Sequence, residues 1–571
     1  MFMKSEIKEY AVMINMKKYI AIKVKEVLTD AKEIIVEIPP KEDMGDYSVP
    51  CFELRNKSLK TPNEVANYIK DNFIDSNNYF NNISVIGPYV NFDINYDLLA
   101  GEVIKRIEDK KESYGSLNQG KSEELLIEHT SINPNAEPHM GRCRNSLIGD
   151  FMSNLYKFLG FNVEKHYFIN DLGKKIALLV IGIEKYSLKT DDFSEILDVY
   201  VKINKDAQSD DSLKQKAFDY LELVENGDKE MIQKFKSITS KCVQGQMKIF
   251  AELDIHFDVF THESDYVHNN QLESILEKIK NKGKLKEDEE SRYYVDLSDY
   301  DIPTKAPVLI LTRSNKTSLY PMKDIAYTIY KMELNDKNNF IVLGEDQMVY
   351  MQQISAVMDI LGYKAPELIS YGYVLLDGNK MGASAGNYVL VLDFINEIKK
   401  ELTNSFKERE LTIDEENLRI LCNACIKFTM LNVAKQKGVN FNMETATSFT
   451  GESGIYILYS IVRINSILRN NDNKIINDKI KFDNVIEQQI IKDLYYFEEL
   501  VNNLIVTKEP ANLTKYIFNL TQKFSTFYEQ VNITNEEDEE LKSSRIRLLN
   551  CTKTVLTNAL SILGIKTVDK M

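Results

Sequence analysis

The chain has 571 residues, which at roughly 150 residues per domain allows about four domains. Apolar residues make up 43% and charged residues 27%, a composition typical of folded globular proteins that excludes a wholly disordered chain. The formal charge of −15 argues against a protein that binds any nucleic acid non-specifically. It does not exclude a specific nucleic-acid partner, because binding needs only a local basic patch.

The cysteine pattern and the hydropathy of the chain favour a cytoplasmic protein. Six cysteines are too few and too scattered for a disulfide framework. Cys422 and Cys425 form a lone CxxC inside an apolar helical pattern, so we expect buried core cysteines rather than metal or redox ligands. Residues 1–18 lack the apolar core of a signal peptide, and no run of about 18 apolar residues occurs, so no membrane partner is expected.

The first part of the chain, residues 1–115, has the pattern of a small α+β module. A helix is predicted over 61–73, because Thr61 is a good cap, Pro62 suits the first helical position and Glu64 is an acid in the first turn. Residues 83–94 form two predicted strands around the turn Gly87-Pro88.

Residues 116–404 have the pattern of a doubly wound α/β domain with an inserted segment. A short apolar strand at 125–127 is followed by a Pro-containing turn and by a helix that begins near Gly141 and runs through Leu159. Further strands are predicted at Val308–Leu311, Phe340–Leu343 and Tyr373–Leu376. Residues 195–250 are mainly helical and charged, and residues 262–306 mix helix and strands.

Residues 405–571 show helical spacing throughout and predict an all-helical bundle. The acidic stretch 535–541 is expected to be a solvated loop or a helix start. The predicted fold class is therefore multidomain α/β, with an α+β module before the doubly wound domain and an all-α bundle after it.

Two segments are candidates for phosphate binding. In residues 128–142, which join a strand to a helix, Gly141 permits close approach of a ligand, and His139 and Arg142 are possible donors at the helix start. In residues 375–387, a Gly-rich loop carries Lys380 as its only cation and could close over a polyphosphate. A capped helix with an ordinary loop, and a surface hairpin, are the respective alternatives.

Two further segments are candidates for the rest of a site. Tyr320 and Asp324 are four residues apart and therefore share one helix face, where they could hold a cation or simply form an ordinary first helical turn. Gly344-Glu345-Asp346-Gln347 follows a predicted strand, and polar ligand-binding clusters are expected at the carboxyl ends of strands in α/β folds.

Taken together and in order, the motifs of this chain resemble those of the class I arginyl-tRNA synthetases over essentially its whole length. Any one of the nine matching segments is a weak signal, but nine in the right order are specific. The segments are Ile38–Tyr47, Gly87–Phe92, Glu128–Arg142 at the position of "HIGH", Phe168–Gly173, Phe257–Ser264, Arg313–Tyr327, Lys380–Asn387 at the position of "KMSKS", Gly454–Arg463 and Arg547–Ile565.

The resemblance implies an arginine–tRNA ligase. Members of the family activate L-arginine with ATP and Mg²⁺ to form arginyl-adenylate and pyrophosphate. They then transfer the arginine to the 3′ end of tRNA-Arg and release AMP. The family usually needs the tRNA to be bound for the first step, and its members are typically monomers. The three predicted parts then become an N-terminal additional domain at 1–115, a catalytic domain at 116–404 and an anticodon-binding domain at 405–571.

The resemblance also implies roles for individual residues. The catalytic cations that face the ATP phosphates would be His139, Arg142 and Lys380. The ATP-binding residues would be His139, Gly141, Arg142, Lys380 and Met381. The arginine-binding residues would be Glu263, Tyr320 and Asp324 around the guanidinium, Asn133 and Gln347 at the α-amino and carboxylate groups, and Glu128 in support. The tRNA-binding residues would be Tyr89, Asn91, Tyr459 and Arg463, and no metal site built from protein side chains is expected.

The chain departs from the family pattern mainly around ATP. Arg142 stands where the second His of "HIGH" is usual, and residues 382–385 lack the usual cations of the "KMSKS" loop. Ala136 stands where a Lys is usual, and Lys174 or Lys175 stands where a Gln is usual. Arg142, Arg144 and Lys174 are candidates to compensate. The alternative function is a synthetase-like paralogue with weak or no aminoacylation that acts as an arginine- or tRNA-binding regulator.

Overall fold

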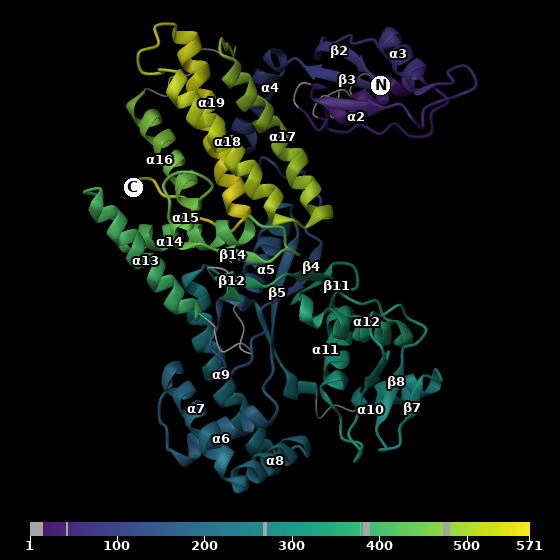
Figure 1. Ribbon diagram of the computed structural model, residues 1–571, viewed down its shortest axis with the longest axis vertical. Coiled ribbons are helices and arrows are strands. Elements are labelled where there is room, and N and C mark those ends of the chain that lie inside the picture. The colour runs from purple at the N-terminus through teal and green to yellow at the C-terminus, as the bar shows by residue number, and fades with distance from the viewer. Residues whose placement is uncertain (1–14, 42–43, 267–270, 377–378, 381–388, 472–479) are drawn as a thin grey trace. The chain divides into compact units, whose positions relative to one another are not determined.

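The computed structural model describes residues 15–41, 44–266, 271–376, 379–380, 389–471 and 480–571 (Figure 1). The chain divides into two compact units. The first comprises residues 1–109, 473–495 and 535–548, and the second comprises residues 110–472, 496–534 and 549–571.

The first unit contains the predicted α+β module. Its sheet has the strand order β1-β3-β2 and is antiparallel. The elements are α2 (Met16–Val27), β1 (Tyr47–Pro50), α3 (Pro62–Asn72), β2 (Phe80–Ile86), β3 (Tyr89–Ile94) and α4 (Tyr96–Lys110). Helix α3 begins as predicted, because the Thr61 hydroxyl accepts a hydrogen bond from the Glu64 amide and the Glu64 carboxylate accepts one from the Thr61 amide. The predicted strands also form on either side of Gly87-Pro88.

The second unit is built on a five-stranded parallel sheet with the order β11-β10-β4-β5-β6. Its strands are β4 (Glu124–Glu128), β5 (Asn162–Ile169), β6 (Val259–His262), β10 (Asn339–Gly344) and β11 (Glu367–Tyr371), and α5 (Met140–Phe158) connects β4 to β5. The strand order reverses between β4 and β10, so the doubly wound prediction is confirmed. Ligands bind at such a switch point, beyond the carboxyl ends of the strands.

The three later strands that the sequence predicts all exist, but only β10 joins the parallel sheet. Strand β9 (Val308–Ile310) belongs to an antiparallel sheet with β7 (Leu285–Glu287) and β8 (Tyr293–Asp296). Strand β12 (Val374–Leu376) pairs with β13 (Asn379–Lys380) and with β14 (Val439–Phe441). Short apolar runs predict strands without predicting their partners, because the pairing is decided by contacts distant in the sequence.

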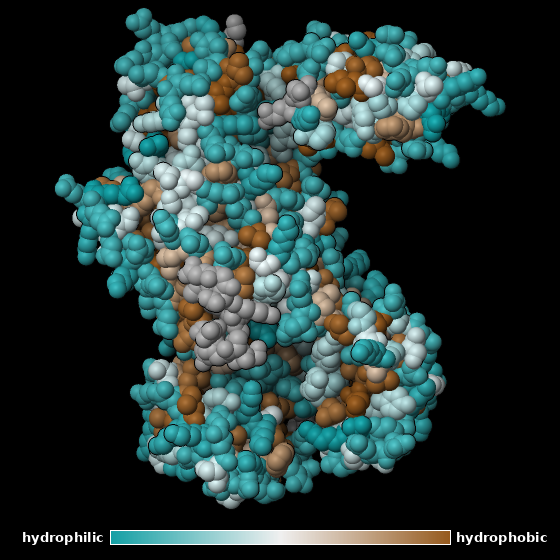
Figure 2. All heavy atoms as spheres, viewed as in Figure 1, coloured by the Kyte–Doolittle hydropathy of each residue, from teal (hydrophilic) through white to brown (hydrophobic). Residues whose placement is uncertain are grey.

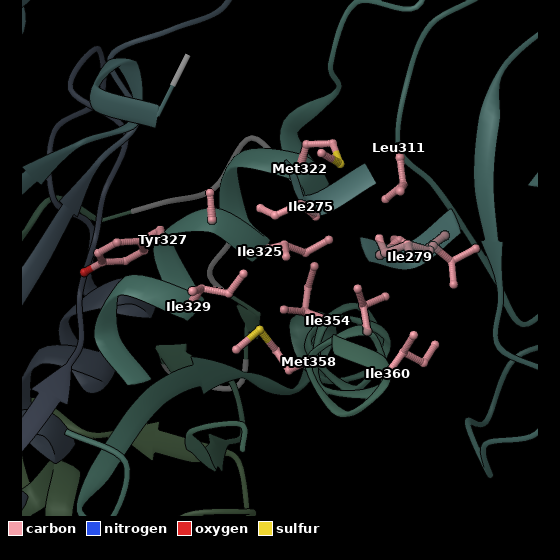
Figure 3. Close-up of a cluster of buried hydrophobic side chains, with 14 of the residues drawn as sticks. Ile275, Ile279, Leu311, Met322, Ile325, Tyr327, Ile329, Ile354, Met358 and Ile360 are labelled. Carbon is pink, nitrogen blue, oxygen red and sulfur yellow. The ribbon is translucent and has the colours of Figure 1, made fainter. Parts of the chain in front are cut away.

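Helices surround the parallel sheet. The predicted helical segment 195–250 forms α7 (Phe193–Ser209), α8 (Asp211–Glu225) and α9 (Lys229–Glu252), and α6 (Lys174–Lys185) precedes it. Helices α10 (Gln271–Asn281), α11 (Tyr320–Leu334) and α12 (Met348–Leu361) pack on a common hydrophobic cluster that includes Ile279, Ile325, Ile329, Ile354 and Met358 (Figure 3). One face of α11 is buried in this cluster, and Lys331 of the same helix pairs with Glu128 at the end of β4.

The remaining chain is almost wholly helical, as predicted. Its helices are α13 (Val391–Glu408), α14 (Glu415–Leu431), α15 (Met443–Ala446), α16 (Gly454–Asn470), α17 (Val485–Thr507), α18 (Pro510–Gln530) and α19 (Glu539–Ile562). The exception is the three-residue strand β14. Cys422 and Cys425 are buried and free in α14, and the acidic stretch 535–541 is a helix start, because α19 begins at Glu539.

The face of the molecule drawn in Figure 2 is mostly hydrophilic and is broken by small hydrophobic patches. Single exposed apolar side chains are normal on protein surfaces. Among the described helices, none combines the length and the apolar character that crossing a lipid bilayer requires.

Candidate active site

Residues of α5 contact the turn after β4 and hold it in place. Thr130 and Ser131 have positive φ angles of 72° and 42°, so the chain turns sharply as it leaves the strand. The Thr130 amide donates to Oδ1 of Asn145 at 2.6 Å. The ring of His129 is buried directly against Gly149, where a Cβ would collide with it, and burial lowers the pKa of His129 to about 3. His129 is therefore a neutral packing residue, and the close contact explains the glycine in α5.

Residues 132–136 are held over the sheet by α9. Nε2 of Gln246 donates to the carbonyl oxygens of Asn133, at 3.0 Å, and Ala136, at 2.8 Å. Nδ2 of Asn170, just beyond β5, donates to Oδ1 of Asn133 at 3.2 Å. The predicted arginine ligand Asn133 therefore lies at the carboxyl edge of the sheet.

The first turn of α5 carries His139 and Arg142. His139 is the N-cap residue, and burial together with the neighbouring Arg142 lowers its pKa, which favours a neutral imidazole. Burial raises the pKa of Tyr371, at the end of β11, whereas the nearby charge of Arg142 opposes that shift. Arg142 thus lies near Tyr371, beside the carboxyl ends of the strands, in the place of the family's second His.

Three acidic residues with the predicted arginine role come together. Glu128 ends β4, Glu263 begins the short 3-10 helix η3 (Glu263–Tyr266) after β6, and Asp324 lies in the first turn of α11. Removal from solvent raises the pKa of Asp324 to about 7, and the charges of Glu263 and Glu128 add to that rise. The influence of both charges on Asp324 indicates that Glu263 and Glu128 lie on its side of the site.

Each of these carboxyl groups already has a partner in the protein. Nζ of Lys331, which is 1% exposed, pairs with Glu128, and Nζ of Lys323 lies 3.1 Å from Oε1 of Glu263. The hydroxyl of Tyr350, from α12, donates to Asp324. These partners were not predicted, although Lys331 follows Asp324 at seven residues, a spacing that places both on one face of a helix.

Asp171 connects the loops that follow β5 and β6. Its carboxylate accepts hydrogen bonds from the Ser264 amide at 2.9 Å and the Ser264 hydroxyl at 2.6 Å, and it lies 3.1 Å from Nδ1 of His262. This buried carboxylate therefore fixes the chain beside Glu263. The sequence marks Asp171 as part of a family motif, but the structure gives it a positioning role.

Tyr320 and Gln347 lie at the same edge of the unit. Tyr320 is the first residue of α11 and is 59% exposed, with its ring centroid 5.5 Å from that of Tyr350. Gln347 ends the 3-10 helix η4 (Glu345–Gln347), directly after β10. The exposed phenol is available to a ligand that enters from solvent.

Two predicted ATP contacts fall partly or wholly outside the described residues. The backbone of Lys380 pairs with Leu375 in β12, whereas its side chain is not described. Met381 and the 382–385 stretch also lie outside the described residues.

Two of the residues proposed to replace the missing phosphate-facing cations, Arg144 and Lys174, have other contacts in the structure. Arg144 cannot reach a nucleotide, because its guanidinium is fully buried and donates to backbone carbonyl oxygens. Lys174 begins α6, and its Nζ lies 5.2 Å from the ring centroid of Phe218 in α8. Of the three candidates, Arg142 is the one that lies in the first turn of α5, beside His139.

The predicted tRNA contacts differ in exposure. Tyr89 begins β3 and is half-buried against Phe52, whereas the side chain of Asn91 is 3% exposed. On α16, the guanidinium of Arg463 lies 4.5 Å from the ring centroid of Tyr459 and 5.1 Å from that of Tyr528 in α18. Such a half-buried row of rings and a cation can accept a stacked base.

Comparison with known families decides the relationship. Models of "tRNA synthetases class I (R), catalytic domain", "DALR anticodon binding domain" and "Arginyl tRNA synthetase N terminal domain" match residues 104–442, 457–571 and 15–94. The chain belongs to the class I arginyl-tRNA synthetase family. The resemblance drawn from the nine ordered segments is thereby confirmed.

Individual members of the family align with nearly the whole chain. The arginine–tRNA ligase of Methanococcus aeolicus is 30% identical over 97% of this chain and 99% of its own. That of Methanocaldococcus jannaschii is 31% identical over 98% of this chain and 100% of its own.

Solved structures agree on the fold. The arginyl-tRNA synthetase of Thermus thermophilus superposes with a TM-score of 0.80 at 22% identity, covering 98% of this chain and 100% of the other. The Plasmodium falciparum enzyme gives 0.80 at 18% identity, covering 97% and 98%.

Proposed function

We propose that the chain is an arginine–tRNA ligase, which activates L-arginine with ATP and transfers it to the 3′ end of tRNA-Arg. The observation that carries the proposal is the group of three carboxyl groups, from Glu128 at the end of β4, Glu263 directly after β6 and Asp324 on α11. Membership of the family and full-length likeness to arginine–tRNA ligases support the same conclusion.

The charge balance of this group suits arginine. Lys331 and Lys323 neutralise Glu128 and Glu263, so an ionised Asp324 leaves one negative charge unbalanced. A guanidinium brings one positive charge and a planar fork of donors that matches carboxylate oxygens. The phenol of Tyr320 supplies an exposed aromatic face beside it.

The remaining residues are placed to hold the reacting ends of arginine and ATP. Asn133 and Gln347 would bind the α-amino and carboxylate groups of arginine, and Glu128 would support that contact. His139, Gly141 and Arg142, at the start of α5, would bind the phosphates, because a helix start offers backbone donors and a positive potential.

The reaction then follows from position and charge. The arginine carboxylate attacks the α-phosphorus of ATP, an oxygen–phosphorus bond forms, and the bond to pyrophosphate breaks. Arg142 and Lys380 would stabilise the charge that develops on the leaving pyrophosphate. The 3′-terminal hydroxyl of the tRNA then attacks the activated carbonyl carbon and displaces AMP.

Mg²⁺ is expected to arrive with ATP. Enzymes that use nucleotides usually hold Mg²⁺ through the phosphates and one or two carboxylates, and Glu345 and Asp346 follow β10 at this edge. Among the described residues, no cluster of three His, Cys, Asp or Glu side chains forms a metal cage.

We further propose that the enzyme works as a monomer in the cytoplasm and that Tyr89, Asn91, Tyr459 and Arg463 contribute to tRNA binding.

ATP–pyrophosphate exchange tests the proposal directly. Exchange should depend on L-arginine, should be negligible with lysine or citrulline, and should be measured with and without tRNA-Arg. Lysine lacks the planar fork and citrulline lacks the charge, so both fail if the carboxylate pocket selects a guanidinium. A protein that binds arginine tightly and supports no exchange under either condition would be a binding paralogue, and the proposal would be wrong.

A further inference from the structure

Arg144 is one of the most buried cations in the second unit. Its side chain is 0% exposed, and its guanidinium donates to four backbone carbonyl oxygens. Nη1 donates to Gly372 at 2.9 Å and to Lys437 at 2.5 Å, and Nη2 donates to Val433 at 3.2 Å and to Ala434 at 3.1 Å. One side chain of α5 thereby joins the end of β11 to the segment 433–437 between α14 and β14.

This arrangement requires arginine rather than any cation. A buried cation without hydrogen bonds would be very costly, and here carbonyl dipoles take the place of water. Burial lowers the pKa of Arg144 to about 10, so the side chain keeps its charge at neutral pH. The four carbonyl oxygens are divided between two terminal nitrogens, and a lysine ammonium, with three donors on one nitrogen, cannot reach all four.

The two backbone segments that Arg144 joins, at Gly372 and at 433–437, continue into the small sheet that contains Lys380. Gly372 precedes β12 by two residues, and β12 pairs with β13 through Leu375 and Lys380. The segment 433–437 leads into β14, which pairs with the other side of β12. Arg144 therefore fixes the base of the small sheet on which the backbone of Lys380 lies.

The chain that follows residues 381–388 is hydrogen-bonded to the start of α5. The Met140 amide donates to the Val389 carbonyl at 2.9 Å, and the Val391 amide donates to the Pro138 carbonyl at 2.9 Å. The first turn of α5, with His139 and Arg142, thus binds the chain on one side of that stretch. Arg144, in the next turn, binds the chain on the other side.

The backbone at Gly372 packs closely against the segment 433–437. A Cβ at Gly372 would lie 2.7 Å from the carbonyl oxygen of Gln436 and 2.9 Å from the carbonyl carbon of Lys437. The Gly372 amide also donates to the Lys435 carbonyl at 2.8 Å. A displacement of the segment 433–437 would therefore also move the entry into β12.

We propose that Arg144 is a positioning residue for adenylate formation, which holds β12 and β13, and with them Lys380, in register with His139 and Arg142. The inference rests on the proposed function, in which these three residues face the ATP phosphates. Arg144 itself touches no substrate.

Two variants of the full chain test the inference by different routes. Arg144→Lys removes the fork, and Gly372→Ala pushes the segment 433–437 away while the guanidinium stays. Because a displacement of about 1 Å costs on the order of 100-fold in rate, both should lower kcat of ATP–pyrophosphate exchange by about that factor. Both should also raise the KM for ATP, whereas the Kd for arginine, measured without ATP, should stay within twofold of the parent value.

Two controls separate positioning from general damage. Gly438→Ala places a Cβ 3.0 Å from the ring of Tyr373, a side chain that is 49% exposed and can give way. Lys427→Met removes another buried cation of the same unit, one that joins Asp150 of α5 to the Gly564 carbonyl, well beyond the first two helical turns. The first control should resemble the parent, and the second should lower Tm without changing the KM for ATP.

The outcomes are distinguishable. If the parent chain shows no exchange even with tRNA-Arg present, the proposed function fails, not the positioning role. If the parent is active and folded Arg144→Lys keeps its kcat and KM for ATP, the positioning role is wrong. The positioning role is also wrong if Arg144→Lys lowers the affinities for arginine and for ATP together, because that pattern indicates general loss of the site. If Arg144→Lys does not fold, Gly372→Ala against Gly438→Ala decides by the same two criteria.

Discussion

Arginine binding should weaken as the pH falls through neutrality, because Asp324 must be ionised to hold the guanidinium. Removal from solvent raises the pKa of this carboxyl to about 7, and the neighbouring charges of Glu263 and Glu128 add to the rise. Below that pH most ligand-free molecules carry a neutral Asp324. A neutral acid attracts a cation far less than a carboxylate does.

The size of the effect follows from the fraction that is ionised. With a pKa of about 7, about nine tenths of the ligand-free molecules carry the carboxylate at pH 8 and about one tenth at pH 6. The apparent Kd is the intrinsic Kd divided by the competent fraction, so it should rise about tenfold from pH 8 to pH 6. The change should flatten above pH 8, where ionisation is nearly complete.

Isothermal titration of the ligand-free protein with arginine, at half-unit steps of pH, measures this dependence. Tyr350→Phe sharpens the test, because the hydrogen bond from the Tyr350 hydroxyl holds the pKa of Asp324 down. Its removal should move the midpoint of the fall to higher pH. A parent Kd that changes less than twofold between pH 8 and pH 6 would refute the assignment of Asp324 to the guanidinium.

Four further results are expected. Asp324→Asn should raise Tm at pH 8, with a gain that shrinks towards pH 4, because a raised carboxyl pKa means that ionisation above pH 4 costs stability in the folded state. Arg142→Ala should lower ATP–pyrophosphate exchange at least tenfold, and an unchanged rate would remove Arg142 from the phosphate site. Lys331→Met should lower stability by about 3–5 kcal/mol in thermal unfolding, and adding Glu128→Gln should recover most of the loss without restoring arginine binding. Arg463→Ala should raise the KM for tRNA about two- to fivefold and leave the Kd for arginine unchanged.

Much of the architecture follows from local sequence signals. The helix start at Thr61, the strand before Glu128 and the long helix after Gly141 each combine a clear pattern with clear boundary residues, and each forms as predicted. The order of motifs along the chain then predicts the doubly wound domain, although single motifs are weak. Each of these signals is a short segment of sequence, and the order of such segments along the whole chain supplies the specificity that a single one lacks.

The features that were missed depend on contacts distant in the sequence. The pairing of β12 with β14 joins residues more than 60 apart, which a three-residue apolar run cannot indicate. Arg144 is a candidate to compensate for missing cations in the sequence, and only the carbonyl oxygens around it, from distant segments, show why it is buried instead. The lysine partners of Glu128 and Glu263 were missed for the same reason, because an ion pair between two elements leaves no periodic pattern in the sequence.

Aminoacylation of tRNA-Arg with labelled arginine tests the central claim most directly. The account predicts arginine- and ATP-dependent charging of tRNA-Arg, with release of AMP and pyrophosphate, and no charging of tRNA-Lys under the same conditions. Binding of arginine and tRNA-Arg with no charge transferred, by a protein shown to be folded, would contradict it and would identify the chain as a binding paralogue of the synthetases.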